Sequence, residues 1–135
     1  MKRLLVVLFA LPLALGALAA RAQLTIEITE GVDNPTPIAV VPFAWQGPGV
    51  APEDMAAVID GDFARSGLFA PVDRADMLGR PSSEQEVFYR DWRAIDTDYL
   101  LIGRASVSEG QMRVEYELFN VLRQTRVLRG GHLGP

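Results

Sequence analysis

The sequence predicts a domain of the α/β or α+β class, with a mixed β-sheet and two main helices. Strand-like and helix-like segments interleave along the chain and do not fall into separate blocks. Some strand-like segments are continuous apolar runs, typical of strands covered on both faces, and others alternate apolar and polar residues, typical of half-buried strands. The length of 135 residues is enough for one domain and too short for two ordinary ones.

A secretory signal peptide is predicted before this domain. Two basic residues are followed by an apolar run over residues 4–20 and by the small-x-small sequence Ala20-Arg21-Ala22. The run is slightly short for a membrane-spanning helix, and Pro12 interrupts it. We therefore expect residues 1–22 to be removed by cleavage after Ala22 and the mature protein to be exported.

The mature chain is acidic, and this excludes several classes of function. Cleavage removes three basic residues and no acidic one, so ten arginines and 17 carboxylates remain, with a net charge of −7. A surface of this charge repels nucleic acid and anionic lipid, so we expect neither nucleic-acid binding nor membrane insertion after cleavage. The sequence contains no cysteine, which excludes a lipid-anchored lipoprotein and leaves the fold without disulfides.

The mature N-terminus, from Gln23 to Glu30, is predicted to be a half-buried strand because its apolar and polar residues alternate. Residues 31–37 contain two prolines and several turn formers, and predict a hinge or stiff spacer. A strand at a free terminus can pair with its own sheet or be released to join the sheet edge of another protein. Periodicity alone leaves both possibilities open. The apolar anchors of this strand are Leu24, Ile26 and Ile28.

The next elements are a buried strand and the first helix. Residues 38–41 form a continuous, β-rich apolar run, which predicts a strand covered on both faces. A helix is predicted to open at Pro52-Glu53-Asp54, since proline suits the first turn and carboxylates complement the positive end of a helix. Gly67 is suited to end this helix in a left-handed cap. Its predicted apolar face contains Met55, Val58, Ile59 and Phe63.

A second helix is predicted from Ser83 to about Ile95. The sequence Ser83-Glu84-Gln85-Glu86 has the pattern of a capping box, and residues 96–98 break the helix. Between the two helices, residues 68–75 are expected to be extended, with Pro71 excluding a central strand position. The predicted apolar contacts of the second helix are Val87, Phe88, Trp92 and Ile95.

A buried strand over residues 99–102, ended by Gly103, and a β-hairpin are predicted next. Residues 108–111 are a plausible hairpin turn, and residues 112–119 alternate with a period of two. We expect one side of this alternation to be apolar and the other to face solvent. The apolar side contains Met112, Val114, Tyr116 and Leu118, and the solvent side contains Arg113, Glu115 and Glu117.

One more strand is predicted from Val121 to Arg129. The glycine-rich residues 130–135 are not expected to continue it and are interpreted as a disordered tail. The α/β domain is therefore predicted to cover residues 38–129, preceded by the strand and hinge over residues 23–37.

The sequence offers no constellation for catalysis, so a catalytic, cofactor-binding or metal-binding residue is not predicted. The single histidine, His132, has no partner residues nearby, and the mature chain lacks cysteine and lysine nucleophiles. Carboxylate pairs are better explained as helix-start charges, strand alternation and turn residues than as a catalytic dyad. Trp45 and Trp92 are interpreted as packing residues and not as ligand platforms. The carboxylate pairs are Glu53 with Asp54, Asp96 with Asp98, and Glu115 with Glu117.

A set of motifs that covers most of residues 23–122 in order resembles the amino-terminal domain of the TolB family. The resemblance begins with the sequence PIAVVPF at residues 37–43 and continues through many matching positions. These are Trp45, residues 47–49 (GPG), residues 51–54 (APED), Ile59, residues 63–69 with Arg65-Ser66-Gly67, Pro71, residues 83–87, Trp92, Ala94, Asp98 and Gly103.

The resemblance implies a periplasmic, non-enzymatic component of the Tol-Pal system, which supports outer-membrane integrity and outer-membrane invagination during cell division. It implies an α/β domain followed by a six-bladed β-propeller, with TolA and Pal as partners, and colicin uptake through the same system. The family's extreme mature N-terminus binds TolA when it is freed. Carried over by position, the TolA-binding residues are Gln23, Leu24, Thr25, Ile26, Glu27, Ile28, Thr29, Glu30, Gly31, Val32 and Asp33.

The end of the chain departs from the family pattern. The sequence LRGGHLGP at residues 128–135 does not resemble the family's continuation towards the propeller. The resemblance places the Pal and colicin contacts mainly on the propeller, so we expect those contacts in full-length family members. A fragment, a shifted reading frame and a natural truncation remain open. A small periplasmic hydrolase that uses carboxylates, or a non-functional remnant, is the alternative to an adapter.

Overall fold

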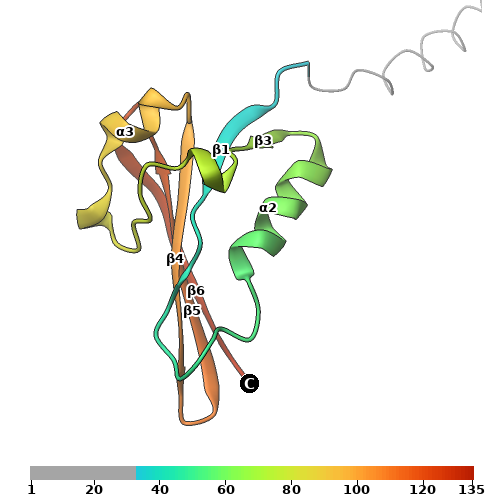
Figure 1. The fold of residues 1–135 in the computed structure, drawn as a ribbon, viewed down its shortest axis with the longest axis vertical. Helices are drawn as coiled ribbons and strands as arrows, with labels where there is room; N and C mark the ends of the chain where they lie inside the picture. The colour runs from blue at the N-terminus through green and yellow to red at the C-terminus, as the bar shows by residue number, and fades with distance from the viewer. Residues whose placement is uncertain (1–32) are drawn as a thin grey trace, which may run out of the picture. The chain divides into compact units, whose positions relative to one another are not determined.

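A mixed β-sheet of six strands organises residues 33–135, which are the residues that the computed structural model describes (Figure 1). The strand order is β3-β1-β4-β5-β6, and β2 pairs with the same edge of β4 as β1 does. Pairing is parallel among β1, β2, β3 and β4 and antiparallel from β4 to β6, so the predicted mixed class is confirmed. The strands are β1 (Thr36–Val40), β2 (Ala44–Trp45), β3 (Phe69–Pro71), β4 (Tyr99–Ser108), β5 (Gln111–Asn120) and β6 (Thr125–Gly134).

Two helices cover opposite faces of this sheet. In Figure 1, α2 (Met55–Ser66) and α3 (Tyr89–Ala94) lie on either side of β4. Successive residues of a strand point to opposite faces, and the two cores divide the strand residues in this way. The α2-face core contains Val40, Leu101 and Ala56, with Ile59, Phe63 and Leu118 packed against it. The α3-face core contains Ala39, Val41, Val87, Trp92, Leu100, Ile102, Phe119 and Val121.

The predicted first helix is confirmed with a shifted start. Asp54 is its N-cap, and the Asp54 side chain accepts a hydrogen bond from the Ala57 backbone N–H at 3.0 Å. Gly67 ends the helix with a φ of 73°, the predicted left-handed cap. Met55 is therefore the first helical residue, and the carboxylate acts at the cap and not within the first turn. The predicted apolar face is wrong for Val58, which is exposed.

The continuous helix predicted from Ser83 to Ile95 is wrong. The structure has a 3-10 turn, η3 (Glu84–Glu86), then two extended residues, then α3. The Ser83 hydroxyl donates to Glu86 Oε1 at 2.9 Å and does not accept from a backbone N–H, so the predicted capping box is incomplete. Residues five apart on a helix project about 140° apart, so an unbroken helix could not aim both Val87 and Trp92 into one core. The extended break resolves this conflict and leaves Phe88 66% exposed.

Strand β4 is longer than predicted, because Gly103 does not end it. A Cβ atom at Gly103 would lie 2.5 Å from Cζ of Phe43, so the glycine admits the Phe43 ring against the strand. The hairpin that follows is confirmed, with β4 and β5 joined by Glu109 and Gly110. Both residues have positive φ, 53° and 75°, as the tight primed turns of hairpins require.

Strand β6 continues through residues 130–134, which were interpreted as a disordered tail. Gly130 lies opposite Tyr116 in the register with β5, and a Cβ atom there would be 2.5 Å from the Tyr116 ring. The glycine therefore provides room for the tyrosine ring over the strand, and the glycine-rich sequence supports pairing at this position. The strand predicted from Val121 to Arg129 therefore begins later, at Thr125, because residues 121–124 form the turn after β5, and it extends further, to Gly134.

The predicted signal peptide and most of the predicted TolA-binding segment lie outside the described residues. Of Gln23–Asp33, the structure describes only Asp33, which is exposed. Within residues 33–135, no helix combines the length and apolar character needed to cross a bilayer.

Candidate interaction site

A buried carboxylate organises the α3 face of the antiparallel strands. Glu117 in β5 is 4% exposed, although the alternation of residues 112–119 predicted a solvent-facing side chain. One Glu117 oxygen lies 3.4 Å from Arg104 Nη1 and the other lies 3.2 Å from Arg126 Nη1. The carboxylate is therefore held between cations from β4 and β6, which is what a buried charge requires.

The two arginines connect Glu117 to the segment that precedes α3. Arg104 also contacts Glu115 at 3.2 Å and donates a hydrogen bond to the Ser82 carbonyl oxygen. Arg126 also pairs with Glu84 at 3.0 Å. These ion pairs connect β4, β5, β6 and the η3 turn, so the network stabilises the packing of these elements. A signal for it exists in the sequence, since Phe119 and Val121 share the side of the alternation that contains Glu117, which indicates that this side becomes covered.

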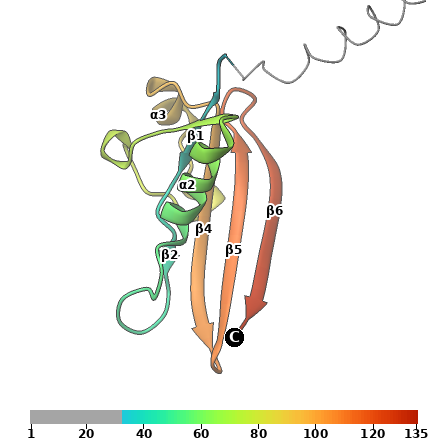
Figure 2. The same cartoon turned by 90° about the vertical axis from the view of Figure 1, so that its right-hand side faces the viewer.

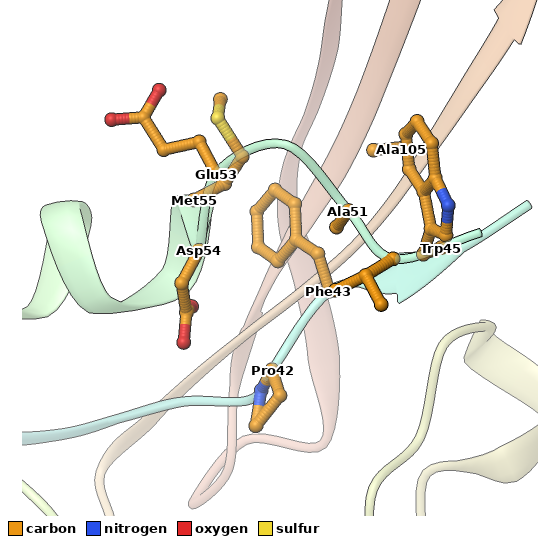
Figure 3. Close-up of a pocket in the computed structure, with 9 residues that line it drawn as sticks. Pro42, Phe43, Trp45, Ala51, Glu53, Asp54, Met55 and Ala105 are labelled. Carbon is orange, nitrogen blue, oxygen red and sulfur yellow. The ribbon is translucent and has the colours of Figure 1, made fainter. Parts of the chain in front are cut away.

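A shallow hollow of about 240 Å³ lies between the loop before α2 and strand β4 (Figure 3). Trp45 and Phe43 contribute aromatic rings to it, and the Trp45 indole donates to the Pro48 carbonyl oxygen at 3.4 Å. In Figure 3 the Glu53 and Asp54 carboxylates point away from these rings. The lining residues are Pro42, Phe43, Trp45, Val50, Ala51, Glu53, Asp54, Met55 and Ala105.

Asp54, the N-cap of α2, accepts hydrogen bonds from an arginine side chain and from a backbone N–H. Arg74 donates to both Asp54 oxygens at 2.8 Å, and Ala57 donates its backbone N–H. The Arg74 hydrogen bonds, followed by the Ala57 hydrogen bond, lower the pKa of Asp54 to about 2. Asp54 is thus a permanently ionised cap at neutral pH. A general acid needs a raised pKa, so this carboxyl group is unsuited to that role.

The remaining residues considered for chemistry occupy structural or exposed positions. Within residues 33–135, no group of three histidine, cysteine or acidic residues is placed to hold a metal ion. His132 is exposed on β6, and Asp96 and Asp98 flank the turn before β4. Trp92 is 3% exposed in the α3-face core, which confirms its interpretation as a packing residue, whereas Trp45 is half-buried in the hollow.

Comparison with known proteins identifies the family. Residues 24–127 match the family model of the TolB amino-terminal domain. The chain belongs to the TolB amino-terminal domain family. The Tol-Pal system protein TolB of Marinomonas sp. (strain MWYL1) is 52% identical over 110 residues, which are 81% of this chain and 26% of that protein. The protein of the same description from Pseudomonas fluorescens (strain SBW25) is 40% identical over 120 residues, which are 89% of this chain and 28% of that protein.

Solved structures agree with TolB membership at the level of the fold. A crystal structure of TolB from Acinetobacter baumannii superposes with a TM-score of 0.58 and 24% identity, over 81% of this chain and 25% of that chain. The LpoB C-terminal domain from Salmonella enterica superposes with a TM-score of 0.60 and 13% identity, over 84% and 90% of the two chains. At these identities the likeness shows a shared fold alone. The chain spans about a quarter of the length of the curated TolB relatives that it matches.

Proposed function

We propose that this chain is a periplasmic adapter of the Tol-Pal system that binds TolA through residues Gln23–Asp33. The observation that carries the proposal is the TolB family match, which begins at residue 24 and so includes nearly all of this segment. The matched relatives are Tol-Pal system proteins TolB, which supports a role as a system component. The adapter acts by binding and has no catalytic step.

The mode of binding follows from the sequence of the segment and the chain that follows it. Residues 23–30 alternate apolar and polar side chains, so as an added strand they would direct Leu24, Ile26 and Ile28 to one face of a partner sheet. The segment continues into β1, which lies inside the sheet between β3 and β4. A force applied to the segment by a bound partner would therefore act on β1, a central strand of the sheet, and not on an edge strand.

The adapter is proposed to act in a system with three functions. These are support of outer-membrane integrity, invagination of the outer membrane during cell division, and colicin uptake. Binding of Pal and of colicins is proposed for the longer TolB relatives. This chain spans about a quarter of the length of those relatives, and the resemblance places the two contacts mainly on the propeller of the longer proteins. A carboxylate-dependent hydrolase receives no support from Glu117, whose charge is already shared by two arginines.

The proposal is tested by titrating the purified chain with the TolA C-terminal domain. Binding should be lost when residues 23–33 are deleted, and Ile26→Asp should weaken it strongly because a charge would replace the central apolar anchor. Arg90→Glu, at an exposed position on α3, is the matched control and should leave affinity unchanged. Equal affinity with and without residues 23–33 would refute the assignment of the TolA site.

A further inference from the structure

The two edges of the described sheet differ in their capacity to accept another strand. At one edge lies β3, which has three residues and ends in Pro71, a residue without a backbone N–H. At the other edge lies β6, which has ten residues, most of them exposed. Figure 2 shows β6 as the outermost strand, with α2 placed over the opposite part of the sheet. Within residues 33–135, no strand pairs with the outer edge of β6.

The register identifies which β6 amides face outward. The Val41 N–H donates to the Leu101 carbonyl oxygen at 3.0 Å, so the backbone polar groups of Leu101 point towards β1 and away from β5. Leu101 is opposite Leu118, whose backbone groups must then point towards β6, and Leu118 is opposite Leu128. Backbone groups of Leu128 therefore face β5, and those of alternate residues face outward. The outward-facing residues after the β-bulge are Arg129, Gly131 and Leu133.

The side chains on this edge are basic, although the domain is acidic. Strand β6 contains two arginines and no carboxylate, whereas residues 33–120 contain seven arginines and 15 carboxylates. Arg126 and Arg129 lie on the α3 face, since they are opposite Phe119 and Glu117 in the register. On the α2 face, Leu128 is exposed beside Leu118. Beside Arg129 and Leu128 the edge thus presents positive charge on the α3 face and an apolar side chain on the α2 face, and Leu133, which is 52% exposed, shares the face of Arg129.

Of the two arginines in β6, Arg129 is the more available to a partner. It is 61% exposed, and its Nε lies 4.0 Å from Glu117, the limit of an ion pair. Arg126 is less available, because it donates to both Glu84 and Glu117. A carboxylate on an added strand opposite Arg129 would form a cross-strand pair of opposite charge, which stabilises antiparallel pairing.

We propose that the outer edge of β6 binds an extended partner segment in which acidic and apolar residues alternate. The partner strand pairs with the amides of Arg129, Gly131 and Leu133, directs its carboxylates towards Arg129, and packs its apolar residues beside Leu128. Charge favours an acidic segment over the same strand of a second copy, because β6 itself contains two arginines and no carboxylate to pair with them. This surface is separate from residues Gln23–Asp33 and does not depend on the proposed TolA site.

The experiment uses the isotope-labelled chain and a blocked synthetic peptide of about eight residues in which glutamate and valine alternate. Saturating peptide should shift the amide signals of Arg129, Gly131 and Leu133 and slow their hydrogen exchange by about tenfold or more. A peptide of alternating lysine and valine should not bind, and raised salt should weaken binding of the glutamate peptide. Signal shifts centred on another part of the chain would overturn the proposal.

Charge reversal provides the matched variants. Arg129→Glu should abolish binding of the glutamate peptide and create binding of the lysine peptide, whereas Arg90→Glu on α3 should change neither. Arg129→Gln, which should lose affinity without gaining the lysine peptide, provides a second test, and unchanged β5 signals would show that each variant folds. Deletion of residues 23–33 should leave peptide binding intact, which separates this proposal from the TolA assignment. Unchanged peptide preference in Arg129→Glu, or concentration-dependent β6 shifts without peptide, would overturn it.

Discussion

At the scale of single residues, Asp54 combines two stabilising roles in one carboxylate. It caps α2 through the Ala57 N–H and pairs with both terminal nitrogens of Arg74. Asp54→Ala should lower the free energy of unfolding by about 1 kcal/mol, the usual cost of losing an N-cap, because the half-exposed ion pair adds little in solvent. Urea denaturation at pH 7 measures this loss.

The same carboxylate predicts a pH dependence. Its pKa falls from 3.8 when unperturbed to about 2 in the folded protein, so its ionised form stabilises folding above pH 3.8. That contribution is lost as pH falls through about 2. The stability difference between the wild type and Asp54→Ala should therefore be constant near neutral pH and shrink between pH 4 and pH 2. Asp54→Asn keeps a cap acceptor without a titrating charge, and a similar acid-dependent loss in that variant would contradict the assignment.

Gly103 illustrates a residue whose importance depends on a neighbour distant in the sequence. Gly103→Ala should destabilise the fold by about 1–3 kcal/mol, because the new methyl group would overlap the Phe43 ring. Gly79→Ala is the matched control, since a Cβ atom there would meet nothing within 4 Å. Thermal unfolding compares the two variants. Adding Phe43→Leu should recover part of the loss, and an unaffected melting temperature in Gly103→Ala would refute this explanation.

At the scale of elements, the interrupted segment from Ser83 to Ile95 shows where local signals mislead. The residues have the spacing and start signal of a helix, but a helix must place its apolar residues on one stripe. Val87 and Trp92 both enter the α3-face core, so tertiary packing selects a turn, an extended break and a short helix. The sequence shows which residues are apolar. Packing against the sheet then determines which backbone conformation brings those residues into the core.

Strand β5 illustrates the same limit for a sheet face. Alternation placed Glu117 correctly on the side opposite Tyr116 and Leu118. Phe119 on the same side indicates that this side is covered, but the sequence does not show that η3 and α3 are the elements that cover it. Whether a strand face is exposed depends on elements that arrive from elsewhere in the chain. The carboxylate is consequently buried with arginines from two neighbouring strands.

The Glu117 network predicts that neighbouring glutamates differ in importance. Glu117→Gln should lower the free energy of unfolding by about 1.5–3 kcal/mol, because Arg104 and Arg126 would lose the charge that they share. Glu115→Gln should cost less than about 1 kcal/mol, since Glu115 is partly exposed and pairs with Arg104 alone. Denaturant unfolding of both variants measures the contrast, and equal losses would show that burial of Glu117 does not control its contribution.

At the scale of the whole molecule, the mixed class could be predicted because the described chain contains both continuous apolar strands and an alternating one. β1 and the first half of β4 are the central strands, and their apolar runs supply both cores. The candidate binding sites could be predicted from the sequence only in part. The TolA segment follows from family resemblance, while the outward amides of β6 require a register and the hollow beside Trp45 requires the fold of a loop.

The sheet predicts a gradient of stability from its centre to the β6 edge. Amides of residues 99–101 in β4 lie between β1 and β5 and should exchange with solvent only on global unfolding, whereas β6 is supported on one side. Within β6, Gly130 and His132 face β5 and should be protected, while Arg129 and Gly131 face outward and should exchange rapidly. Hydrogen exchange followed residue by residue by nuclear magnetic resonance tests both levels, with the β4 amides as the internal control for global unfolding. Equal protection of Arg129 and Gly130 would mean that the outer edge is already paired, and a free binding edge on β6 would then be untenable.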